Sequence, residues 1–93
     1  MHPTEIIPQA NRMKGKILIV DDQPLNIKIL HQLFHEDYEM FMATNGEQAI
    51  AVCQNELPDL VLLDIEMPGM TGYEVCQRLK ADPATANLCI IFV

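Results

Sequence analysis

Two short apolar runs that each end directly in aspartate constrain this chain more than any other feature. The first, Lys16–Val20, is followed by Asp21 and Asp22, and the second, Asp59–Leu63, is followed by Asp64. Both runs are continuous rather than alternating in apolarity, which is typical of strands covered on both faces of a parallel sheet. The sequence therefore predicts carboxylates at the carboxyl ends of two buried strands.

Three segments have the apolar spacing of amphipathic helices. The first begins near Pro24, which suits a first helical turn. The second runs from Gly46 to about Asn55, and the third ends at Asp82-Pro83. Their predicted core-facing residues are Ile27, Leu30, Leu33 and Phe34 in the first, Ala49, Val52 and Cys53 in the second, and Val75, Cys76 and Leu79 in the third.

Two further apolar runs predict the remaining strands. Glu39–Ala43 suits a strand whose methionines face the core, and Leu88–Val93 suits a fourth buried strand. Strand and helix then alternate three times before the last strand, which indicates an α/β fold: one open parallel sheet with helices on both faces. Residues 1–15 are predicted to be a flexible leader or linker, so that residues 16–93 form a single domain.

Charge and cysteine content narrow the classes of function. Thirteen acidic and six basic residues give a net charge of -7, and such a surface repels the phosphates of nucleic acids. Cys53, Cys76 and Cys89 are odd in number and far apart, which favours reduced thiols in a cytoplasmic protein over a disulfide or zinc framework. No apolar run approaches the roughly 20 residues of a membrane span.

The carboxylates after the strands form the candidate site. Open parallel sheets bind ligands beyond the carboxyl ends of their strands, so Asp21, Asp22 and Asp64 converge if the first and third strands are neighbours. Two carboxylates about 4 Å apart repel by roughly 4 kcal/mol at an effective dielectric of about 20. A hard cation such as Mg²⁺, which prefers oxygen ligands, offsets that repulsion. Taken singly, each aspartate suits a turn, and Asp22 suits a cap for the helix at Pro24.

Two motifs give the chain a resemblance to the receiver domains of two-component response regulators. The segment Ile17–Asn26 is similar to the opening of a receiver, and Asp59–Gly72 is similar to its phosphoacceptor strand and following loop. Their separation of roughly 40 residues suits a βαβαβ arrangement. The resemblance covers Lys16 to Val93 and implies a flavodoxin-like receiver fold.

The resemblance also implies a role for each matching residue. Asp64 would accept a phosphoryl group from a sensor histidine kinase, a phosphotransfer protein or a small phosphodonor. Asp22 would bind Mg²⁺ directly, Asp21 would hold it through water, and the backbone carbonyl of Glu66 would be a further ligand. We predict that the acidic side chain of Glu66 tunes metal affinity or the lifetime of the phosphate.

The sequence departs from the family pattern after its fourth strand. After their fourth strand, receivers continue with a helix, a fifth strand and a last helix. They also have a Ser or Thr at the end of the fourth strand and a lysine after the fifth strand. None of these can be matched here, and Lys80 in the third helix is not a candidate. The resemblance is thus to a receiver truncated after its fourth strand. We expect such a domain to be phosphorylated slowly and to transmit no signal from the phosphate. We also expect Leu88–Val93 to form an open apolar edge that favours self-association.

Two rival functions stay open beside the phosphoacceptor module, which is not expected to be an enzyme. One is a receiver-like scaffold or dimerisation module that no longer signals. The other is a haloacid-dehalogenase-like phosphatase, which wants a second aspartate two residues after its nucleophile, where this chain has Glu66. Separately, His31 and His35 have a spacing that can bind a transition metal, although a solvated helix face is the commoner explanation.

Overall fold

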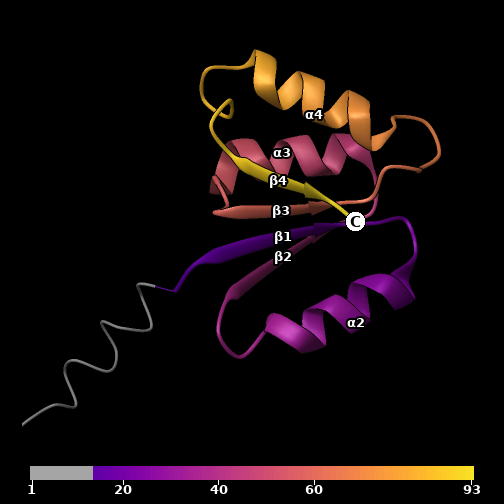
Figure 1. Cartoon of the computed structure of the whole chain (residues 1–93), viewed down its shortest axis with the longest axis vertical. Coiled ribbons are helices and arrows are strands. Elements are labelled where there is room, and N and C mark those ends of the chain that lie inside the picture. Colours follow the sequence, from indigo (N-terminus) through magenta and orange to yellow (C-terminus); the bar gives the residue numbers. More distant parts are fainter. Residues whose placement is uncertain (1–13) are drawn as a thin grey trace, which may run out of the picture.

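The structure is a computed structural model that describes residues 14–93, so the predicted leader lies almost wholly outside the described residues. Strands and helices alternate along the chain as predicted (Figure 1). The strands are β1 (Lys16–Val20), β2 (Glu39–Ala43), β3 (Leu60–Leu63) and β4 (Cys89–Phe92). The helices are α2 (Pro24–Phe34), α3 (Gly46–Glu56) and α4 (Gly72–Ala81), and none of them is long and apolar enough to cross a membrane.

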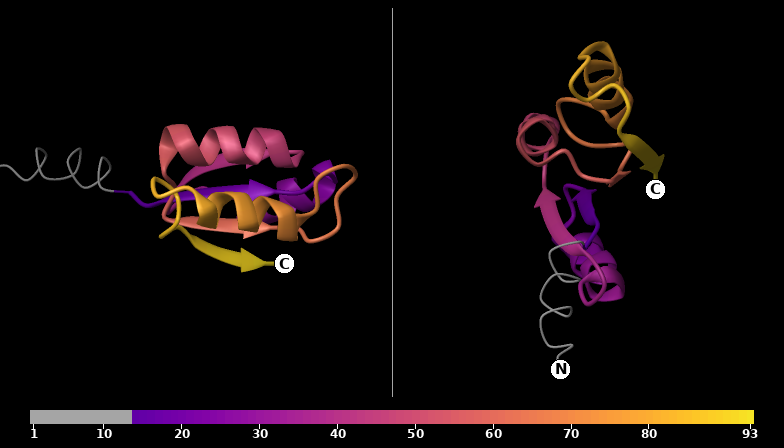
Figure 2. Two further views of the ribbon diagram at one scale, coloured as in Figure 1. Left: turned by 90° about the horizontal axis from the view of Figure 1, so that it is seen from above. Right: turned by 90° about the vertical axis from the view of Figure 1, so that its left-hand side faces the viewer.

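The four strands form one sheet in the order β2-β1-β3-β4, and every neighbouring pair is parallel. Helix α2 lies on one face of this sheet, while α3 and α4 lie on the other (Figure 2). Both observations confirm the predicted open parallel sheet with helices on both faces. The strand order also makes β1 and β3 neighbours, which is the condition for their terminal aspartates to meet.

Alternate residues of the central strands supply two separate cores. Because side chains alternate across a strand, Leu18 and Val20 pack toward α3 and α4, whereas Ile17 and Ile19 pack toward α2. The larger core adds residues of β3, both helices and the loop before α4, namely Val61, Leu63, Ala49, Cys53, Met67, Met70, Val75 and Leu79. The two central strands, β1 and β3, are therefore buried on both faces, as their continuous apolar sequences predict.

Two residues predicted to face the core are exposed instead. Leu33 of α2 is 66% exposed and Met42 of β2 is 51% exposed. Helix α2 packs mainly on β1 and β2. Its buried stripe is therefore narrower than the sequence pattern predicts, with Ile27 buried and Leu30 and Phe34 packed at its margin. Met42 lies on an edge strand, where less of the neighbouring structure covers it.

The apolar run Leu88–Val93 was predicted as a buried strand from its sequence alone and as an open edge from its departure from the family pattern; the structure confirms the edge and not the burial. Within residues 14–93, β4 is an edge strand bonded only to β3. Ile90 is half-buried against the larger core, but Ile91 is 48% exposed and Phe92 37% exposed. An apolar sequence therefore predicts a buried strand even where, as in β4, no further strand pairs with its outer edge in the described residues.

Candidate functional site

The three aspartates meet where β1 and β3 end. The last paired residues of these strands are Val20 and Leu63, so the residues that follow them leave the sheet side by side. Each of Asp21, Asp22 and Asp64 offers a carboxylate oxygen, and these three atoms all lie within 4.8 Å of one another. The structure thus brings together the three side chains that the sequence placed at strand ends.

Asp21 is the most firmly held member of this acidic cluster of Asp21, Asp22 and Asp64. It is only 5% exposed. Its Oδ1 accepts a hydrogen bond from the backbone N–H of Gln23 at 2.9 Å, and its Oδ2 accepts one from Asn26 Nδ2 at 3.2 Å. Both carboxylate oxygens are therefore oriented by protein donors before any ligand is considered.

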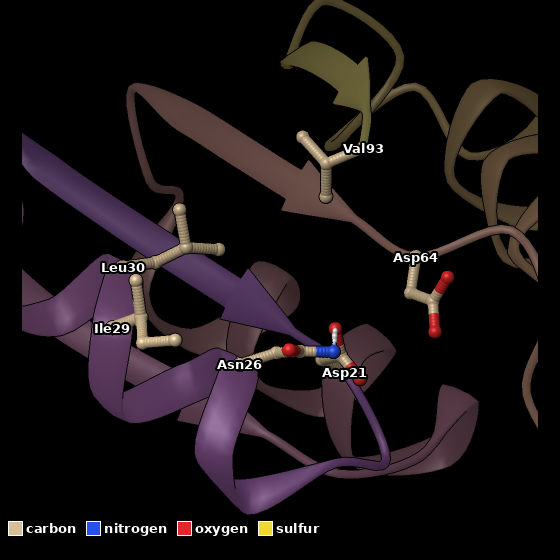
Figure 3. A pocket seen from close by; sticks show the side chains of 6 residues that line it. All are labelled: Asp21, Asn26, Ile29, Leu30, Asp64 and Val93. Atoms are coloured by element: carbon tan, nitrogen blue, oxygen red, sulfur yellow. Dashed lines mark hydrogen bonds between the residues drawn. The ribbon is translucent and has the colours of Figure 1, made fainter.

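Asn26 is a site residue that the sequence analysis missed. It belongs to the first turns of α2, and the turn between β1 and α2 brings its amide back over the end of β1 (Figure 3). A polar residue one helical turn after a strand-end aspartate was the available signal. Because Asn26 also lines the pocket beside Asp64, it belongs to the same site as the carboxylates.

Asp22 has a different environment. It is half-buried, and none of the described residues makes a hydrogen bond to its side chain. The N-cap of α2 is Gln23, and no side chain caps this helix. The alternative explanation of Asp22 as a helix cap was therefore wrong, and its carboxylate is available to a ligand.

Asp64 is destabilised in its charged form. Burial is the largest cause that raises the pKa of this carboxyl, followed by the negative charge of Asp21 and then that of Asp22; the N–H of Glu66, 3.3 Å from Oδ1, acts in the opposite direction. A cation among the three carboxylates removes the repulsive part of this effect. The donor set consists only of hard oxygens, so it fits Mg²⁺ better than a soft metal.

A pocket of about 300 Å³ opens beside the cluster (Figure 3). Its acidic end is formed by Asp21, Asn26 and Asp64, and its apolar end by Ile29, Leu30 and Val93. No lysine or arginine lines it among the described residues. Lys80, which the sequence analysis had set aside, donates to the carbonyls of Ala86 and Leu88 at the opposite end of α4.

The loop after Asp64 returns tightly to the site. Gly69 has a φ of 78°, which favours glycine. The N–H of Gly72 donates to the carbonyl of Ile65 at 2.8 Å, and a β-carbon at Gly72 would collide with the carbonyl oxygen of Asp64. Thr71 then begins α4 with a capping box. The loop therefore presses the start of α4 against the backbone of Asp64.

Glu66 is exposed and lies within this loop. Its N–H bonds to Asp64, and its carboxylate does not join the three-residue cluster. Its predicted part in metal binding runs through the backbone carbonyl and stays a prediction.

Comparisons with known proteins agree with this geometry. The sequence pattern of the family described as "Response regulator receiver domain" matches residues 17–93. The chain is 42% identical over 82 residues to the response regulator PleD of Caulobacter vibrioides, covering 87% of this chain and 18% of PleD. It is 49% identical over 69 residues to sporulation initiation phosphotransferase F of Bacillus subtilis, covering 73% of this chain and 56% of that protein.

Solved structures show the same likeness in three dimensions. The N-terminal domain of a response regulator receiver protein from Methanoculleus marisnigri superposes with a TM-score of 0.81 at 35% identity, covering 84% of this chain and 64% of that one. A receiver domain of a signal transduction histidine kinase from Syntrophus aciditrophicus gives a TM-score of 0.80 at 34% identity, covering 85% and 61%. The chain thus spans less than two thirds of these relatives, and it belongs to the response regulator receiver domain family.

Proposed function

We propose that this receiver domain accepts a phosphoryl group on Asp64 while Asp21, Asp22, Asp64 and the backbone carbonyl of Glu66 hold Mg²⁺. The observation that carries the proposal is the cluster of three carboxylates, whose oxygens lie within 4.8 Å at the ends of β1 and β3. Such a concentration of negative charge opposes phosphate binding unless a cation accompanies it. A strand-end carboxylate beside a divalent-ion site is the arrangement that phosphoryl transfer to a carboxylate requires.

The chemistry assigned to Asp64 is a simple displacement. A carboxylate oxygen of Asp64 attacks the phosphorus of a phosphohistidine, a P–O bond forms and the P–N bond breaks. The leaving nitrogen keeps the electron pair of that bond and takes a proton from solvent. When bound, the divalent ion neutralises charge on the phosphoryl oxygens. The protein contributes position: Asp21 is fixed by two donors, and the Glu66 N–H orients Asp64.

The phosphodonor is a sensor histidine kinase or a phosphotransfer protein, and α2 offers it a surface. Leu25, Ile29 and Leu33 are 67%, 49% and 66% exposed, and they recur every four residues along one side of this helix. Ile29 also lines the pocket, so a partner that packs on this stripe is adjacent to Asp64.

The names of two relatives, a histidine kinase from Formosa agariphila and the sporulation phosphotransferase, support a donor of this kind. A donor of this kind and the chain's free thiols favour a cytoplasmic setting.

The proposal has a direct test by NMR. Beryllium fluoride added with Mg²⁺ mimics a phosphoryl group on aspartate, so amide shifts should cluster at Asp21, Asp22 and Asp64. The matched variant Asp64→Asn should keep its fold and lose the response to beryllium fluoride. No clustered shifts in the wild type would instead favour a scaffold that no longer signals, and turnover of a generic phosphate ester would favour the phosphatase alternative.

Glu66 is proposed to tune this site from its exposed position. Its charge adds to three carboxylates that already repel the phosphoryl group. Glu66→Gln should therefore change Mg²⁺ affinity or the rate of dephosphorylation by a few-fold, since the side chain is solvated. Equal affinities and equal rates in the two proteins would show that the side chain is inert.

A second proposed property is self-association through Leu88–Val93. Within the described residues, β4 has one bonded neighbour, and Ile91, Phe92 and Val93 are 48%, 37% and 55% exposed. An apolar strand with a free edge offers unpaired N–H and C=O groups to a second copy of the chain.

A further inference from the structure

We propose that His31 and His35 form a second metal site, in which two imidazole nitrogens bind a transition-metal ion such as Zn²⁺. The two residues are four apart on α2, so they lie on the same side of the helix. Their ring centroids are 5.1 Å apart. This inference does not depend on phosphorylation of Asp64.

The separation of the two rings suits joint ligation of one ion. A Zn–N bond is about 2.0–2.1 Å, and tetrahedral geometry then places the centroids of two bound imidazoles roughly 5 Å apart. The observed 5.1 Å matches that requirement without movement of the helix. The rings are nearly parallel, with 13° between their planes. Ligation therefore requires a turn about χ2, which is a soft torsion for histidine.

Both rings are accessible for such a turn. His35 is exposed and His31 is half-buried. No side-chain hydrogen bond within residues 14–93 holds either imidazole, and their only described ring contact is with each other. Binding an ion therefore disrupts no polar contact that the structure describes.

The local electrostatics favour a cation at this end of α2. His31 is in the last turn and His35 is the C-cap, whose N–H donates to the carbonyl of His31 at 2.9 Å. The carboxyl end of a helix carries partial negative charge from its unbonded carbonyls. The acidic residues Glu36, Asp37 and Glu39 follow directly, in a chain whose net charge is -7.

This histidine pair is chemically distinct from the acidic cluster. The cluster lies at the amino end of α2 and the pair at its carboxyl end. About 10 Å of helix, at about 1.5 Å per residue, separates Asn26 from the pair. Hard oxygen ligands select Mg²⁺, whereas imidazole nitrogens select Zn²⁺, Ni²⁺ or Cu²⁺. The two sites should therefore fill independently when both kinds of ion are present.

The test is a Zn²⁺ titration of the whole chain with excess Mg²⁺, followed by NMR. The ring resonances of His31 and His35 should shift together and saturate with one equivalent of Zn²⁺. His31→Gln and His35→Gln should each weaken binding at least about tenfold, because a single imidazole loses the chelate. Gln32→Ala, on the same helix, is the matched control and should titrate like the wild type.

Other ligands are separated by the same experiment. His2→Gln and Cys89→Ser remove the competing imidazole and the exposed thiol, and neither should change the shifts of His31 and His35. Independent movement of the two rings, or unchanged Zn²⁺ affinity in both His→Gln variants, would overturn the proposal. Unchanged amide spectra of these variants without Zn²⁺ would exclude misfolding as the cause of lost binding.

Discussion

The acidic cluster destabilises the charged form of Asp64 when no cation is present. Burial and the charges of Asp21 and Asp22 raise the pKa of this carboxyl. The folded chain therefore binds this proton more tightly than the unfolded chain does, and the contribution of Asp64 to stability falls as pH rises from the ordinary aspartate value of about 3.9 through the raised pKa. At neutral pH the charged side chain opposes folding.

Asp64→Asn should consequently stabilise the metal-free protein at neutral pH. The expected gain is on the order of 1 kcal/mol, below the Coulomb figure for a buried pair, because the pocket is open to water. The gain should shrink at acidic pH, where Asp64 is protonated, and with added Mg²⁺. Thermal unfolding across pH measures it, with exposed Asp37→Asn as the control. A gain that does not vary with pH would contradict the electrostatic cause.

Asn26 would act on the proposed metal site through Asp21. Its amide holds Asp21 Oδ2 at 3.2 Å, and Asn26→Leu keeps a similar volume while removing that donor. Mg²⁺ affinity should fall roughly tenfold, as is typical when a hydrogen bond that orients a ligand is lost. Amide shifts during an Mg²⁺ titration give the affinity, and Gln32→Leu on the same helix controls for added apolar surface. Equal affinity in the Asn26 variant would show that the Gln23 N–H suffices to orient Asp21.

At the scale of elements, the loop between β3 and α4 connects Asp64, the proposed phosphoacceptor, to a helix. Gly72→Ala should destabilise the fold by about 3 kcal/mol, because the new β-carbon meets the backbone of Asp64 and Ile65, which cannot rotate away. Urea unfolding measures the loss. Gly15→Ala is the control, since its β-carbon would meet the Tyr38 ring at 3.3 Å, and a side chain can yield. Equal losses in both variants would refute a special role for the loop.

The elements also show where sequence patterns succeed. Pro24 begins α2 as predicted, and Ala49 and Cys53 of α3 are buried. These assignments follow from local spacing, which a helix imposes on its own residues. The burial predicted for Leu33 was wrong because it depends on which elements lie opposite that side chain. The sequence of an apolar segment does not reveal whether another element packs against its outer face.

For the molecule as a whole, the self-association proposed above would depend on the edge of the sheet at β4. If copies pair through β4, then Ile91→Lys should raise the dissociation constant of the dimer at least about tenfold, because a charge on an edge strand blocks pairing. Sedimentation at increasing concentration measures this. Leu57→Lys is the control, since Leu57 is 52% exposed but lies at the end of α3. A wild-type chain that stays monomeric at high concentration would remove the basis for self-association.

The sequence by itself determined the α/β class, the alternation of elements and the three aspartates at strand ends. Each of these depends on neighbours along the chain: apolar runs, helical spacing, and the residue that follows a strand. The receiver resemblance of the two motifs depends on such local order as well, and family membership confirms it.

Only the tertiary structure decided what meets in space. It made β1 and β3 neighbours, so that Asp21, Asp22 and Asp64 share one site. It also brought the Asn26 amide to Asp21. The physical reason is the same in each case: hydrogen bonding and burial between distant segments depend on strand order and helix placement, which no local pattern of residues encodes.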